Sequence, residues 1–104
     1  MTIRHMLYAL KTNMKDLVVA KTFSINISIG ANTTYTATAI GLTEAIPDGY
    51  KPIAVYCAAT GANTVTCYQC RLGTGNVGVL QLRNWINSVQ SISPLLTVIS
   101  IRDI

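Results

Sequence analysis

Over residues 23–29, and again over 33–40, the chain alternates apolar with small polar residues, and this rhythm restricts the fold more than any other feature of the sequence. Over 23–29 the polar positions are serines and asparagine, and over 33–40 threonines alternate with tyrosine and alanines. The apolar set of the first segment is Phe23, Ile25, Ile27 and Ile29. Because successive side chains of a strand point to opposite faces, each segment predicts a strand with one buried face.

Four further segments read as strands, each bounded by glycine or proline turns: 53–59, 64–72, 77–84 and 96–102. Proline presets φ and glycine accepts a positive φ, so Pro47-Asp48-Gly49 predicts a turn. The final strand is apolar on both faces, as expected of a strand that is covered on both sides.

A short glycine-containing loop joins 53–59 to 64–72, which predicts a hairpin. A three-residue loop would place Tyr56 opposite Tyr68 and Cys57 opposite Cys67. A two-residue turn would mix apolar and polar positions across the pair, so the longer loop is preferred.

Six strands joined by short connections, with no helix between them, predict a mainly β fold: an antiparallel, jelly-roll-like β-sandwich. A chain of 104 residues is the size of one domain. We expect residues 1–20 to form an N-terminal helical stem and residues 21–104 to form the β-sandwich head.

The expected helix carries a heptad pattern. Apolar residues recur at steps of four, three, four and three, namely Ile3, Leu7, Leu10, Met14 and Leu17. This seam either packs a single helix on its own domain or bundles identical chains. We favour the bundle, because 12% charged residues and a mean hydropathy of +0.40 leave more apolar surface than a small monomer covers.

Charge and hydropathy argue against several classes of protein. The eight basic residues are scattered against four acids, without the clustering that phosphate binding needs, so no nucleic-acid partner is expected. No run of about 18 apolar residues occurs, so no membrane span is expected. The start of the chain lacks the apolar stretch of a signal peptide, and synthesis in a reducing compartment is expected.

Catalytic and cofactor sites are not expected either. The lone His5 and the carboxylate pair Glu44 and Asp48 are weak candidates for hydrolysis. Residues 73–78 match the glycine fingerprint of dinucleotide sites, but a strand-like run follows where that site requires a helix. We therefore predict a protein that is not an enzyme and binds no cofactor.

The cysteines predict structural thiols. Cys67 and Cys70 have the CxxC spacing of zinc sites, but on a strand this spacing sends the two thiols to opposite faces. No metal is expected. Cys57 and Cys67 would lie close enough across the hairpin to oxidise in air, with free thiols in fresh protein.

A polar loop over 85–94 is the best candidate for ligand binding. Aromatic faces supplemented by amides and hydroxyls are suited to sugars. The candidate ligand-binding residues are Trp85, Asn84, Asn87 and Gln90. The alternative is that Trp85 anchors the loop into the core or into a subunit interface, since tryptophan is large and mostly buried.

Four features occur in order along the chain: a heptad helix, a Ser/Thr-rich alternating strand, the segment Ile46-Pro47-Asp48-Gly49-Tyr50-Lys51-Pro52-Ile53 and the final β run 96–101. Together they resemble the C-terminal head domains of bacteriophage tail-fibre and receptor-binding proteins. The resemblance covers most of residues 5–102 and carries over no binding residue. It implies a homotrimer whose stem feeds β-sandwich heads that recognise bacterial surface saccharides.

The same resemblance implies synthesis in the bacterial cytoplasm and a place in the virion tail beside other virion proteins. The chain is shorter than long fibres, which carry a shaft and an attachment region. Two alternatives remain open: a purely structural virion component that binds no host ligand, and a glycan-active enzyme.

Overall fold

The computed structural model describes residues 17–103, and this part of the chain is mainly β, with antiparallel sheets and no α-helix. The elements are β1 (Val18–Ser24), β2 (Ile27–Ile29), β3 (Thr34–Gly41), the 3-10 turn η1 (Thr43–Ala45), β4 (Tyr50–Ala59), β5 (Val65–Leu72), β6 (Val77–Asn84), β7 (Gln90–Ile92) and β8 (Leu95–Arg102). The expected N-terminal helix lies outside the described residues. Nowhere in 17–103 is there a helix with the length and apolar content to cross a membrane.

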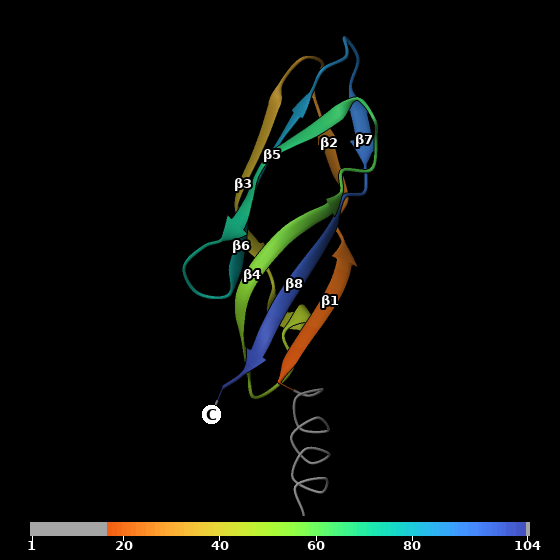
Figure 1. The fold of residues 1–104 in the computed structure, drawn as a ribbon. Helices are drawn as coiled ribbons and strands as arrows, with labels where there is room; N and C mark the ends of the chain where they lie inside the picture. The colour runs from red at the N-terminus through yellow and green to blue at the C-terminus, as the bar shows by residue number, and fades with distance from the viewer. Residues whose placement is uncertain (1–16, 104) are drawn as a thin grey trace, which may run out of the picture.

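The strands form two layers (Figure 1). One layer is the sheet β3-β6-β5. The other contains the sheet β1-β8-β4, and the short pair β2-β7 extends it. The extension is direct, because β1 leads into β2, β7 leads into β8, and the Ile25 N–H donates to the Pro94 carbonyl between the two ladders at 3.1 Å. The central strands β6 and β8 are each hydrogen-bonded on both sides.

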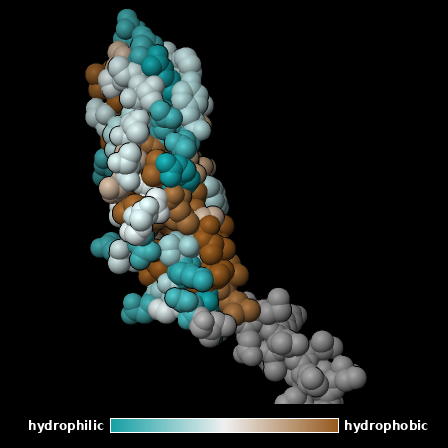
Figure 2. Space-filling model, turned by 90° about the vertical axis from the view of Figure 1, so that its left-hand side faces the viewer, coloured by the Kyte–Doolittle hydropathy of each residue, from teal (hydrophilic) through white to brown (hydrophobic). Residues whose placement is uncertain are grey.

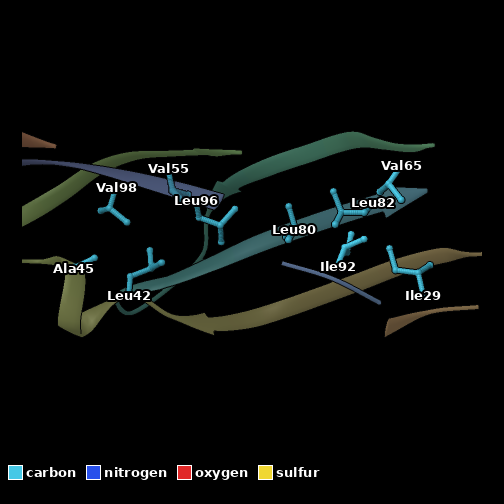
Figure 3. Close-up of a cluster of buried hydrophobic side chains, with 10 residues drawn as sticks. All are labelled: Ile29, Leu42, Ala45, Val55, Val65, Leu80, Leu82, Ile92, Leu96 and Val98. Carbon is cyan, nitrogen blue, oxygen red and sulfur yellow. The ribbon is translucent and has the colours of Figure 1, made fainter. Parts of the chain in front are cut away.

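The core fills the space between these layers (Figure 3). Its buried side chains come from both layers and from the segment around η1, namely Ile29, Leu42, Ala45, Val55, Val65, Leu80, Leu82, Ile92, Leu96 and Val98. The two central strands supply Leu80, Leu82, Leu96 and Val98, and none of these is more than 1% exposed. Alternate residues of β6 and β8 therefore point inward, which leaves the intervening residues on the outer faces.

The alternation that predicted the early strands is confirmed. Ile29 is 2% exposed, and Phe23, Ile25 and Ile27 pack against the same core. The segment does not form one strand, however, because it divides at Ile25 and Asn26 into β1 and β2. β1 also begins at Val18, so residues 18–20, which the sequence analysis placed in the helical stem, form part of a strand.

The expected polar loop over 85–94 contains a strand that the pattern did not reveal. Residues Gln90–Ile92 form β7 and pair with β2 in antiparallel register. A three-residue strand is too short to show a period in the sequence, and only its partner makes it recognisable.

The predicted hairpin between β4 and β5 is wrong. β4 pairs with β8, and β5 pairs with β6, so the connection at 60–64 crosses from one layer to the other. Tyr56 and Tyr68 consequently belong to different sheets. Alternation specifies which face of a strand is buried but not which strand lies beside it, and here a distant partner replaces the adjacent one.

Glycine is required in that crossing connection. Gly61 has φ +91, and a Cβ atom there would approach the Ser93 backbone nitrogen to 3.2 Å and the Ile92 Cβ to 3.3 Å. The earlier turn behaves as the sequence predicts. Gly49 has φ +82, and the Tyr50 N–H closes the turn on the Pro47 carbonyl at 3.1 Å.

Ser100 provides a test of the core. Its side chain is fully buried in β8, and its hydroxyl has no hydrogen-bond partner within residues 17–103. A buried hydroxyl without a partner costs about 1–3 kcal/mol. We expect Ser100→Ala to raise the free energy of unfolding by about 1 kcal/mol in denaturant titrations at fixed protein concentration.

Thr97→Val is the matched control, because the buried Thr97 hydroxyl is paired with that of Thr22 at 2.8 Å. This variant should be neutral or less stable. A lower free energy of unfolding for Ser100→Ala would show that the Ser100 hydroxyl has a partner and contributes to the fold.

Candidate binding face

Trp85 follows directly after β6 and is 53% exposed. It therefore does not anchor the loop into the core, which was one of the alternatives for this residue. Its backbone N–H donates to the Thr64 carbonyl at 3.0 Å, which holds it beside the start of β5. Its indole Nε1–H donates to the Thr66 hydroxyl oxygen at 3.0 Å. The ring therefore lies on the surface in a fixed position.

Two further side chains surround the indole. The Arg83 guanidinium carbon lies 5.1 Å from the centroid of the Trp85 ring, within the range of a cation–π contact. The Tyr68 ring meets the indole edge to face, with centroids 6.3 Å apart and an interplanar angle of 84°. Trp85, Arg83 and Tyr68 form what we call the aromatic cluster. Tyr68 is 55% exposed, so the cluster is open to solvent.

The aromatic cluster continues into a polar sheet surface. Leu80 and Leu82 point into the core, so Gln81 and Arg83 lie on the outer face of β6. Register places Thr34 and Thr66 on either side of Arg83, and Thr36 and Gln69 on either side of Gln81. Together with the cluster, these residues define the polar face: Thr34, Thr36, Thr66, Tyr68, Gln69, Gln81, Arg83 and Trp85.

Hydrogen bonds fix part of this surface. The Arg83 guanidinium donates to the Thr34 hydroxyl oxygen at 3.4 Å. Thr34 and Thr66 thus hold the cation and the indole from opposite sides, through neighbouring strands. The arrangement offers a flat apolar ring beside hydroxyls, amides and a guanidinium, which suits a ligand with both apolar and hydroxylated surfaces.

The other predicted binding residues lie elsewhere. Asn87 is exposed, and its side-chain oxygen accepts from the Asn32 amide at 3.4 Å. Gln90 is half-buried in β7 and donates to the Val89 carbonyl at 3.3 Å and to the Ser88 hydroxyl oxygen at 3.4 Å. Neither belongs to β3, β5 or β6.

Asn84 is fully buried and acts within the fold. Its side-chain amide nitrogen lies 3.3, 3.1 and 2.9 Å from the carbonyl oxygens of Ile29, Gly30 and Ser88. Its side-chain oxygen accepts from the Ile86 N–H at 3.2 Å. One side chain therefore joins the end of β6 to the end of β2 and to the loop that carries Trp85, and its amide is not accessible at the surface.

Sequence reasoning missed Arg83, Tyr68 and Thr66. The alternation of Gln81 and Arg83 with leucines marked an outward polar face on their strand. The sequence did not show which strands flank it, because the pairing of β6 with both β3 and β5 is a property of the tertiary structure.

The three cysteines are free thiols that pack against the core. Cys57 and Cys67 each donate to a carbonyl two residues ahead, of Ala59 at 3.3 Å and of Gln69 at 3.5 Å, beside a bulge in each strand. Within residues 17–103, no three His, Cys, Asp or Glu side chains converge as a metal site would require.

Burial raises the pKa values of two of these thiols. Desolvation, followed by the proximity of Cys67 and Cys70, raises the pKa of Cys57 to about 11. Desolvation and then Cys67 raise the pKa of Cys70 to about 11. Both thiols therefore stay protonated at neutral pH, which makes them poor nucleophiles.

Residues 73–78 do not form a phosphate-binding loop. The Gly73 N–H donates to the Val77 carbonyl at 2.8 Å, and the chain continues into β6 at Val77. These residues therefore connect two antiparallel strands, as the strand-like run after them predicted.

The two carboxylates considered as a hydrolytic pair, Glu44 and Asp48, are both exposed. Glu44 belongs to η1, and Asp48 belongs to the turn before β4. The seam residues Ile3, Leu7, Leu10 and Met14, like His5, lie outside the described residues. Leu17 precedes β1 and is 36% exposed.

Comparison with protein-family models, with curated proteins and with solved structures found no match to this chain.

Asn84→Asp tests the structural role of Asn84. The substitution keeps the shape but replaces the donor nitrogen with a carboxylate oxygen that faces carbonyl oxygens. We expect a loss of at least about 3 kcal/mol in the free energy of unfolding, because the buried charge has no partner there. Asn87→Asp is the exposed control and should change stability by less than about 0.5 kcal/mol. Equal effects in denaturant titrations would contradict this role.

The thiols predict a fall in stability at alkaline pH. An unfolded cysteine loses its proton near pH 9.0, whereas folded Cys57 and Cys70 keep theirs to about pH 11. Ionisation thus favours the unfolded chain as pH rises between these values, and the free energy of unfolding falls.

The test compares two proteins that differ only in these thiols, so that other effects of alkaline pH cancel. We expect the doubly substituted Cys57→Ser, Cys70→Ser protein to lose less stability between pH 9 and pH 11 than the parent chain. Parallel curves for the two proteins would show that these thiols ionise alike in the folded and unfolded states.

Proposed function

We propose that this chain is a non-enzymatic receptor-binding head of the phage tail-fibre or tail-tip type, whose polar face binds a saccharide of the bacterial surface. The proposed architecture is a jelly-roll-like sandwich on a helical stem, assembled as a homotrimer in the virion tail. The observation that carries the ligand proposal is the aromatic cluster, in which an exposed indole is fixed by Thr66 beside Arg83 and Tyr68.

The chemistry of the polar face supports a sugar ligand. A pyranose ring presents an apolar C–H face that packs on an aromatic ring, while its hydroxyls exchange hydrogen bonds with polar groups. Gln69 and Gln81 provide amides, and Thr34 and Thr36 provide hydroxyls, on the strands beside the indole. An aromatic ring has few rotatable bonds, so fixing it in advance reduces the entropic cost of binding.

Charge favours an anionic saccharide. Arg83 lies on the polar face, and Arg71 occupies the corresponding outward position further along β5. The acids within residues 17–103 are Glu44, Asp48 and Asp103, and none of them belongs to β3, β5 or β6. A guanidinium can bind a sugar carboxylate or phosphate in bidentate fashion.

Titration with soluble monovalent saccharides tests the proposal. The chain has one tryptophan, so tryptophan fluorescence reports changes in the surroundings of Trp85 alone. We expect uronic-acid saccharides to change this emission with a higher affinity than neutral sugars, and added salt to weaken their binding more. Arg83→Ala and Tyr68→Ala should each lower the affinity about tenfold or more, equivalent to about 1.4 kcal/mol.

Tyr56→Ala is the matched control, because Tyr56 is 48% exposed on the other sheet and should not affect binding. A glycan array extends the test to Trp85→Ala, which removes the fluorescent reporter. An array signal that survives Trp85→Ala would overturn the proposed site. A parent chain that binds no glycan would favour a purely structural virion component.

A further inference from the structure

The outer face of the sheet β1-β8-β4 differs in character from the polar face. Leu96 and Val98 point into the core, so the alternate residues of β8 lie outward. Register places residues of β1 and β4 beside them. What we call the apolar face consists of Val18, Ala20, Tyr56, Leu95, Ile99 and Ile101.

Much of the apolar face is in contact with solvent. Val18 is 52% exposed, Tyr56 is 48% exposed and Leu95 is 39% exposed. In Figure 2 hydrophobic residues gather along the right-hand border of the lower half of the described body, which is the side that Figure 1 shows from the front. The hydroxyls of Thr22 and Thr97, within the same surface, bond to each other at 2.8 Å. These hydroxyls therefore have a hydrogen-bond partner without water, so the whole surface is suited to contact with another protein surface.

The sequence of β8 indicates that something covers it. Its pattern is apolar on both faces, as in strands buried on both sides, yet the described residues cover only the core side fully. An exposed patch of this kind on a small soluble domain commonly marks an interaction surface.

Charge permits an identical chain as the occupant. The formal net charge is +4, so most contacts between two copies would bring like charges together. The six residues of the apolar face are uncharged. The cation beside them is the exposed Lys51, which register places opposite Ile101 near the start of the edge strand β4. Lys51 therefore lies at a corner of the face, and two copies can meet over the other residues without burying an unpaired charge.

The place where the chain enters the sheet supports the same occupant. The Arg102 N–H donates to the Leu17 carbonyl at 2.9 Å, which extends the β1–β8 ladder to the first described residue. Residues 1–16, which carry four of the five predicted seam residues, are thus joined directly to the edge strand of this sheet, and the fifth, Leu17, extends the ladder itself. A seam that gathers identical chains would also gather their apolar faces.

We propose that the apolar face packs around a common axis against the apolar faces of neighbouring copies of this chain. The inference rests on the proposed self-association but is independent of the proposed ligand. It also assigns opposite roles to the two sheets, with β1-β8-β4 facing the axis and β3-β6-β5 left open for ligand.

The size of the face predicts that it acts together with the seam. Eight residues of β8 and three strands span about 26 by 14 Å, on the order of 370 Å². Two such faces bury on the order of 700 Å², below the roughly 1,200 Å² of a stable interface. Sheet and stem contacts are therefore both needed for a lasting assembly.

The decisive experiment compares two tyrosines of similar exposure, Tyr56 on the apolar face and Tyr68 on the polar face. Light scattering and sedimentation equilibrium measure the mass and dissociation constant of the full chain. We expect the parent chain to exceed its monomer mass of 11.2 kDa, and Tyr56→Glu to raise the dissociation constant at least tenfold. Tyr68→Glu should assemble like the parent.

Val18→Lys provides a second, independently placed variant on β1 and should also weaken assembly. Circular dichroism identifies any variant that fails to fold. Monovalent saccharide titration, read from Trp85 fluorescence, should be unchanged in Tyr56→Glu and Val18→Lys and weakened in Tyr68→Glu. The crossed pattern separates the interface from the ligand site.

Each other outcome overturns a specific part. If folded Tyr56→Glu and Val18→Lys assemble like the parent, the apolar face is not the interface. If Leu7→Ser dissociates the assembly while both face variants do not, the stem alone associates and this inference fails, although the proposed oligomer stands. If the parent chain has the mass of a monomer, the proposal of self-association is wrong altogether. The saccharide titration then decides the ligand proposal independently.

Discussion

Two central strands, β6 and β8, impose the constraint on which the rest of the structure depends. Each is hydrogen-bonded on both sides, and each sends alternate side chains into one shared core. Because the strand period is two, the residues that do not build the core must lie outside it. The outward positions of the two strands carry different side chains: β6 presents Gln81 and Arg83, whereas β8 presents Ile99 and Ile101. This asymmetry gives the molecule one polar and one apolar outer face.

A buried amide and an exposed indole stand next to each other at the end of β6. Asn84 is held by backbone carbonyls of β2 and of the following loop, and Trp85 is held by Thr64 and Thr66 of the neighbouring segment. Adjacent residues of a strand point to opposite sides, so one can stabilise the fold while the other faces solvent. The hydrogen bonds of Asn84 thus hold the strand end that carries the indole. A ring that is held in place before a ligand arrives loses less conformational freedom on binding.

The two proposals reinforce each other physically without sharing residues. If copies of the chain gather through β1-β8-β4, every polar face points away from the assembly. Several weak saccharide sites held in one particle bind a surface far more tightly than one site alone, since later contacts form at a high effective concentration. The raised pKa values of Cys57 and Cys70 fit a core that excludes water between the layers, where the neutral thiol is favoured.

The sequence by itself determined the mainly antiparallel β character, the turn at Gly49 and the inward faces of the early strands, because these depend on local φ preferences and on a period of two residues. It also singled out Trp85. Only the tertiary structure decided that β4 pairs with β8 and not with its neighbour β5, that Tyr68 and Arg83 join Trp85, and that Asn84 is buried. Backbone hydrogen bonds are the same in any pairing of strands, so the choice of partner follows from how all the buried side chains fit together at once, and no local pattern encodes that fit.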